Sequence, residues 1–190
     1  MLFDKALVRE KLLEWEETLL SYSLPEWDAF PTLPLYMDQV IFLLNQYLSP
    51  LPQEEAERQV TPAMINNYVK LKIIPAPVKK RYGRVHLSYL IMVCVMKQTL
   101  NTGEIRRLLP AAPEEAQAQA VYAEFVGAYR EMKDYFCRQL RAAAQPVLAE
   151  EAAPVSRLIF QASAAANLSK LLTEQLILLR REEPPEAEKK

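Results

Sequence analysis

The chain has 190 residues and a net charge of −1, and its 51% apolar and 25% charged residues are enough for a buried core. Its glycines, Gly83, Gly103 and Gly127, are too widely spaced for a glycine-rich phosphate loop. One histidine and two cysteines leave little material for a metal centre or a histidine-based catalytic triad. The composition therefore predicts a protein that is not an enzyme and has no catalytic residues, metal or cofactor.

The N-terminus and the cysteines favour a cytoplasmic protein. Asp4 and Lys5 interrupt the start of the chain, where a signal peptide would have its apolar core. No stretch approaches the roughly 20 apolar residues of a membrane span, so we expect no membrane contact. Two cysteines are too few for a disulfide framework. We expect Cys94 to be a small buried apolar residue, and Cys137 to be half exposed on a long helix.

Positive charge is concentrated in one segment. Residues 58–109 hold ten lysines and arginines and a single acid, Glu104, for a net charge of +9. The other residues hold thirteen basic and twenty-three acidic side chains, for a net charge of −10. A basic segment of this length inside an acidic protein predicts binding to a polyanion. The alternative is a solvated basic face that the acidic flanks balance.

Prolines divide the chain into predicted helices. The expected elements, in chain order, are a helix over 4–22, a connector over 23–34, a helix over 35–48, a loop over 49–59, a helix over 61–72, a basic loop or hairpin over 78–83, helices over 84–100 and 101–109, a long helix over 114–144, a final helix over 154–181 and a disordered tail over 182–190. No longer stretch has the alternation of a strand. The fold class expected is therefore all-α, with a small β-wing at most.

Local signals support several of these helices. Thr61 followed by Pro62 is typical of a helix start, with threonine as N-cap. Asn101 and Glu104 have the spacing of a capping box. The apolar run over 90–96 predicts a helix that is buried all round.

An aromatic seam runs along the predicted long helix. Its members repeat at spacings of three and four and are Tyr122, Phe125, Tyr129, Met132 and Phe136. The spacing predicts a face that packs against the N-terminal and final helices. A dimer contact and the lining of an effector pocket are the alternatives.

The helix predicted over 61–72 has two chemically different faces. The apolar face contains Ile65, Tyr68 and Val69. The opposite face contains Ala63, Asn66, Asn67 and Lys70. Asparagine can form paired hydrogen bonds with adenine in the major groove, and lysine can reach guanine or phosphate. We interpret this segment as a recognition helix; the alternative is that the asparagines are ordinary exposed residues, or that Asn67 caps a neighbouring helix.

The same region resembles a known family signature. The residues that carry the resemblance run over 59–70 and 73–82. They are similar to the uncharacterised bacterial domain-of-unknown-function family eighteen-thirty-six, whose fold resembles the MerR-type winged helix-turn-helix. The places of that pattern are occupied by Tyr68, Ile74, Pro75, Lys79, Lys80, Arg81 and Tyr82. The resemblance covers residues 35–109.

The resemblance implies sequence-specific binding of duplex DNA, as in a transcriptional regulator. The residues expected at the DNA are Thr61, Ala63, Asn66, Asn67, Tyr68, Lys70, Lys79, Lys80, Arg81, Tyr82 and Arg84. Tyr68 has the core as an alternative environment, and Tyr82 has an anchoring role as an alternative. MerR regulators usually carry arginine where Asn66 and Lys80 stand, and the loop over 49–59 is longer than their turn, so base preference is not carried over.

The expected organisation is a MerR-like winged helix-turn-helix embedded in a helical bundle. Its parts are an N-terminal helix and connector over 1–34, the winged module over 35–110, long helices over 111–181 and the tail over 182–190. The expected partners are duplex DNA and a second copy, bound through the helices over 114–144 and 154–181. A small-molecule effector is a further expectation. The alternative functions are a protein-interaction adaptor that does not bind DNA and an effector-sensing helical bundle.

Overall fold

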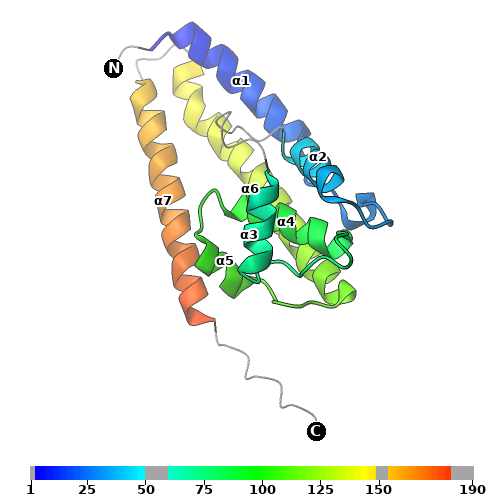
Figure 1. The fold of residues 1–190 in the computed structure, drawn as a ribbon. Coiled ribbons are helices and arrows are strands. Elements are labelled where there is room, and N and C mark those ends of the chain that lie inside the picture. The colour runs from blue at the N-terminus through cyan, green and yellow to red at the C-terminus, as the bar shows by residue number, and fades with distance from the viewer. Residues whose placement is uncertain (1–2, 50–59, 149–153, 181–190) are drawn as a thin grey trace.

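The computed structural model describes residues 3–49, 60–148 and 154–180, and these residues are mostly helical (Figure 1). The elements are α1 (Lys5–Ser21), the 3₁₀ turn η1 (Trp27–Ala29), α2 (Met37–Leu48), α3 (Pro62–Lys70), α4 (Arg84–Met96), α5 (Thr102–Leu108), α6 (Glu115–Leu148) and α7 (Val155–Leu179). The described residues include no strands, and β-structure is limited to isolated bridges between Leu35 and Tyr82 and between Val78 and Arg81. The prediction of an all-α fold is confirmed.

Most helix starts agree with the sequence signals. The Thr61 hydroxyl accepts a hydrogen bond from the Met64 amide at 3.3 Å. The Asn101 carboxamide accepts from the Glu104 amide at 3.0 Å, and the Glu104 carboxylate accepts from the Asn101 amide at 2.7 Å, which completes the predicted capping box. The helix predicted over 84–100 ends earlier, at Met96, and the long helix continues beyond the predicted residue 144 to Leu148. The loop over 50–59 and the tail over 182–190 lie outside the described residues.

Helix α4 lies at the centre of the hydrophobic core. Every residue from His86 to Cys94 is buried, as the apolar run predicts for residues 90–94. Val95 and Met96, at the end of the run predicted over 90–96, are only partly buried. Helix α4 packs against α2 and α6, and the same core includes Tyr22 near one end of the chain and Ile177 near the other. One core therefore holds the segment from α2 to α5 and parts of the flanking segments together.

The connector between α1 and α2 is a structural part of this core. Trp27 and Phe30 are buried, and both pack against the Tyr122 ring on α6, with ring centroids 6.4 and 5.2 Å apart. The Tyr122 hydroxyl donates to the Pro25 carbonyl at 2.7 Å. The proline-rich segment is thus fixed to the long helix and positions the start of α2.

Helices α1 and α6 lie side by side in Figure 1, where α1 contacts the C-terminal half of α6. The Trp15 and Phe136 rings meet edge to face at 5.8 Å, and Arg141 pairs with the buried Glu16 at 2.9 Å. This contact buries Cys137, which is only 3% exposed. The expectation that Cys137 is half exposed was therefore wrong, because α1 covers that side of α6.

The aromatic seam of α6 divides into two parts. Tyr122 is fully buried, while Phe125 and Tyr129 are partly buried against the core. Met132 and Phe136 are exposed, at 63% and 40%. A repeat of seven residues drifts by about 20° per heptad on a straight helix with 3.6 residues per turn, so one straight seam cannot face the same core throughout.

None of the described helices is both long enough and apolar enough to cross a membrane.

Candidate nucleic-acid interface

Helix α3 is fixed by its apolar face and by its two ends. Ile65 is fully buried and Tyr68 is 5% exposed, on the side of α3 that faces the core. The Asn45 carboxamide on α2 accepts a hydrogen bond from the Val60 amide at 3.1 Å, just before α3 begins. Helix α3 therefore has a defined orientation relative to α2.

The opposite face of α3 is open to solvent. Ala63, Asn66, Asn67 and Lys70 are all exposed, as the helical spacing predicts. Among the described residues, none forms a hydrogen bond or ion pair with the side chains of the two asparagines or of Lys70. Neither asparagine caps any of the described helices. No described residue therefore occupies the polar groups on this face, and they can bind a ligand.

Helix α3 ends in a Schellman motif that places Lys72 in an unusual conformation. The Ile73 amide donates to the Tyr68 carbonyl and the Lys72 amide donates to the Val69 carbonyl, both at 3.0 Å. Lys72 has φ 55°, in the left-handed region where glycine usually stands. This exposed lysine was not among the expected DNA-binding residues. The sequence places Lys72 between the end of the helix and the Ile74–Pro75 stop, and this position could have indicated an exposed DNA-binding lysine.

The basic segment after α3 forms a tight turn. The Arg81 amide donates to the Val78 carbonyl at 2.9 Å, and the two central residues, Lys79 and Lys80, have φ 50° and 61°. Positive φ at both central positions is typical of a type I′ turn, which usually contains Asn-Gly. Among the described non-glycine residues, only Lys72, Lys79 and Lys80 have a left-handed φ, and all three are exposed.

The base of this basic turn, residues 78–81, is anchored to the segment before α2. Leu35 and Tyr82 exchange two backbone hydrogen bonds, of 2.8 and 2.9 Å. The Arg81 guanidinium lies over the Tyr36 ring, 4.2 Å from its centroid, and donates to the Tyr36 hydroxyl at 2.6 Å. The Arg84 Nε donates to the Phe30 carbonyl at 3.3 Å. The basic turn is therefore rigid at its base and exposed at its tip.

The structure thus separates the expected site residues into three groups. Thr61, Ala63, Asn66, Asn67, Lys70, Lys79 and Lys80 are exposed. Tyr68 and Tyr82 are buried, which favours the core alternative for Tyr68 and the anchoring alternative for Tyr82. Arg81 and Arg84 form the structural contacts described above, so their guanidinium groups are only partly available to a ligand.

His86 ties together the two ends of the segment that contains the basic turn. Its Nδ1 accepts a hydrogen bond from the Gly83 amide at 3.0 Å, and its Nε2 lies 3.3 Å from the Ala76 carbonyl oxygen. A neutral ring that carries its proton on Nε2 satisfies both contacts. Burial lowers the pKa of His86, although the two backbone contacts partly oppose that shift.

We expect the free energy of unfolding to decrease when the pH falls below the ordinary histidine pKa of about 6.5. As the pH falls, His86 binds a proton in the unfolded chain first, because its pKa is lowered in the folded state. The free energy of unfolding therefore decreases until the pH falls through the lowered pKa. His86→Gln keeps an acceptor at the same helix position but does not titrate. Urea unfolding of both proteins between about pH 7.5 and pH 5 measures the difference, because His86 is the one histidine of the chain. Parallel stability profiles would contradict the expectation.

The basic segment has no acidic partners in the described structure. Nine of its lysines and arginines are described, and none forms an ion pair with a described acidic residue. Ion pairs do form elsewhere, at Lys11, Arg130, Arg141 and Lys170. Within the described residues, direct contacts therefore leave the positive charge of this segment uncompensated.

Other kinds of site have weaker support. An open hollow of about 370 Å³, lined by Thr18, Pro25 and Gln46 among others, is large enough for a small molecule but contains no charged side chain. A smaller cavity of about 170 Å³ lies between Tyr22 and Lys133. The Lys133 ammonium there already donates to the carbonyls of Leu20 and Tyr22. In the described parts of the chain, no three or more His, Cys, Asp or Glu side chains gather so that they could hold a metal ion.

Residues 25–132 match the family described as Domain of unknown function (DUF1836), which is more than half of the chain. The chain belongs to the DUF1836 family. Searches of curated proteins and of solved structures gave no significant match.

The DUF1836 match contains the whole candidate interface. It begins at the connector that packs on Tyr122, includes α2 to α5 and ends within α6. All of α1 and all of α7 lie outside the matched residues.

Proposed function

We propose that this DUF1836 protein binds duplex DNA through α3 and the basic turn, in the manner of a MerR-like winged helix-turn-helix. In this proposal α3 enters the major groove, and the basic turn holds the adjacent phosphate backbone. Sequence-specific binding of this kind is typical of a transcriptional regulator, which would act in the cytoplasm.

The left-handed lysines are the observation that carries the proposal. A non-glycine residue in this region is less stable by roughly 1–2 kcal/mol than in the right-handed region. Strained residues of this kind cluster at functional sites, where the surrounding structure holds them in place. Lys72, Lys79 and Lys80 are exposed cations without described acidic partners, which is what phosphate binding requires.

The exposed face of α3 supports base recognition beside this phosphate contact. Asn66 and Asn67 are adjacent on an exposed face, and their carboxamides make no hydrogen bonds to described residues. Because α3 is fixed at both ends, these side chains need little ordering of the backbone before they bind.

We expect Asn66→Ala and Asn67→Ala to reduce discrimination between DNA sequences more than affinity for an arbitrary duplex. A paired hydrogen bond to one base contributes about 1 to 3 kcal/mol of discrimination. The measurement is competition between a preferred duplex and a scrambled one. Gln139→Ala is the matched control, because it removes an exposed carboxamide from α6. An equal loss of affinity for every duplex would argue against base recognition by α3.

The proposed function is tested by selection from a pool of random duplexes, followed by affinity measurements on the enriched sequence. We expect enrichment of one motif, which binds at least about 1,000-fold more tightly than a scrambled duplex. A pool that stays random after repeated rounds would contradict sequence-specific binding, and would favour an adaptor whose basic face meets an acidic protein.

A further inference from the structure

The middle of α7 lacks the contacts that normally stabilise a helix. Helix α7 is held near its ends, where Val155 and Ile177 are buried, and it contacts α5 and α6. All ten residues over 161–170 are exposed, on every side of the helix. Helices in proteins owe most of their stability to the packing of an apolar face, so this stretch needs a partner.

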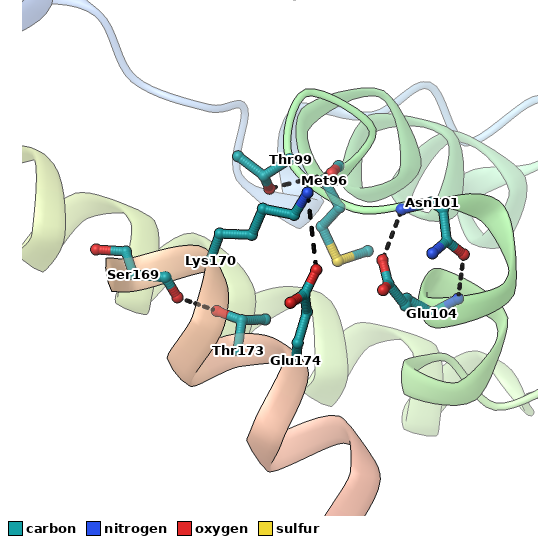
Figure 2. A network of polar contacts seen from close by, with 8 residues as sticks. All are labelled: Met96, Thr99, Asn101, Glu104, Ser169, Lys170, Thr173 and Glu174. Atoms are coloured by element: carbon teal, nitrogen blue, oxygen red, sulfur yellow. Dashed lines mark hydrogen bonds and ion pairs between the residues drawn. The ribbon is translucent and has the colours of Figure 1, made fainter. Parts of the chain in front are cut away.

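The polar and apolar sides of α7 are reversed relative to an ordinary surface helix. The charged residues between Leu158 and Leu179 are Lys170 and Glu174, which pair with each other at 3.7 Å. Figure 2 shows both side chains turned toward the end of α4, near Met96. A helix that covers a monomer has its charges outside and its apolar face inside.

The outward side of α7 is apolar instead. Its large side chains have exposed fractions between 47% and 77% and are Phe160, Leu168, Leu171, Leu172, Leu176, Leu178 and Leu179. Monomeric soluble proteins rarely leave a continuous apolar patch of this extent exposed, and such patches mark interaction sites.

We propose that α7 packs antiparallel against α7 of a second copy of this chain, with a two-fold axis beside Leu168. The sizes of the side chains favour this arrangement. Antiparallel pairing places the small Ala164 opposite Leu172, and Phe160 opposite Leu176, so large and small groups interlock. Parallel pairing would place alanine against alanine and leave a gap.

Charge and area support the same partner. Between Leu158 and Leu179 the outward face carries no charge, and the exposed Arg157 lies on the same side only at the margin of this stretch. An identical uncharged face complements the stretch, and a two-fold contact of this kind is self-complementary. A helix of 25 residues is about 37 Å long, and an antiparallel pair in contact along a third of each surface buries roughly 1,000 Å² in total. That area reaches what a specific interface needs. The inference does not depend on DNA binding, because it is tested without DNA.

The first test is the mass of the full chain in solution by light scattering. We expect a dimer for the wild type and a monomer for the variant with Leu168→Glu and Leu172→Glu. Both leucines point to solvent in one copy, so the variant folds as a monomer, which circular dichroism verifies. Leu33→Glu is the matched control, since this leucine is 77% exposed but lies in the connector, and it should remain dimeric. A monomeric wild type, or a dimer that survives both glutamates, would overturn the proposal.

The second test determines the orientation by disulfide trapping. Leu168→Cys should form an intermolecular disulfide with itself, because it lies beside the axis. Ala164→Cys should do so only when mixed with Leu172→Cys, since two copies of residue 164 are about 12 Å apart along an antiparallel pair. The native Cys94 and Cys137 are buried and do not interfere. Efficient trapping of Ala164→Cys alone would show a parallel pair and refute the antiparallel arrangement.

Discussion

A chain with Lys79→Asn and Lys80→Gly is expected to be more stable than the wild type and to bind duplex DNA more weakly. The Asn-Gly pair is the preferred sequence for a type I′ turn, so it relieves the left-handed strain of the two lysines. We expect the free energy of unfolding to rise by about 1 kcal/mol. Two phosphate contacts are lost, so affinity at physiological salt should fall by roughly 10- to 100-fold.

The salt dependence separates a phosphate contact from an indirect effect. Each lost contact should make the slope of log affinity against log salt less steep by about 0.9, or nearly two units for the pair. Arg9→Ala with Arg138→Ala is the matched control, because it removes two exposed charges outside the basic segment. A stabilised turn variant whose slope equals that of the wild type would mean that Lys79 and Lys80 do not bind phosphate.

Tyr122→Ala is expected to cause a large loss of stability. The Tyr122 ring is fully buried between Trp27 and Phe30, and its hydroxyl satisfies the Pro25 carbonyl. Removal of a buried aromatic side chain decreases the free energy of unfolding by about 3 to 5 kcal/mol. Total stabilities are typically about 5 to 15 kcal/mol, so much of the fold's stability would be lost. Urea unfolding followed by circular dichroism measures the effect.

Two further variants assign the cause of that loss. Tyr122→Phe keeps the ring and leaves the Pro25 carbonyl without its partner, so it should lose only about 1 to 3 kcal/mol. Tyr135→Ala removes an exposed tyrosine from the same helix and should change stability by less than about 1 kcal/mol. If Tyr122→Ala and Tyr135→Ala decreased the free energy of unfolding by the same amount, the connector would not be part of the core.

The elements of this fold could be predicted from sequence where the signals are local. Thr61 and Asn101 form caps within three residues of themselves, and the two faces of α3 follow from helical spacing. The buried run in α4 needs no knowledge of its neighbours. The candidate interface could be predicted to the same extent, because exposure of Asn66 and Lys70 depends on the same spacing.

Features that depend on tertiary structure could not be predicted in this way. Arg81 contacts Tyr36, which lies 45 positions earlier in the chain. Because the sequence does not show this contact, the basic run over 79–81 predicts the same DNA-binding role for Arg81 as for Lys79 and Lys80. The burial of Cys137 depends on where α1 lies on α6. The apolar spacing of α7 predicts a helix, but the side that faces solvent is set by Val155 and Ile177 at its two ends.

The central claim, that the basic segment binds duplex DNA, is tested most directly by titration of the full chain against a fluorescent mixed-sequence duplex at several salt concentrations. We predict binding in the micromolar range or tighter at physiological salt, with a log–log slope that corresponds to about five or more phosphate contacts. An absence of binding even at low salt, or an affinity that does not change with salt, would contradict the account.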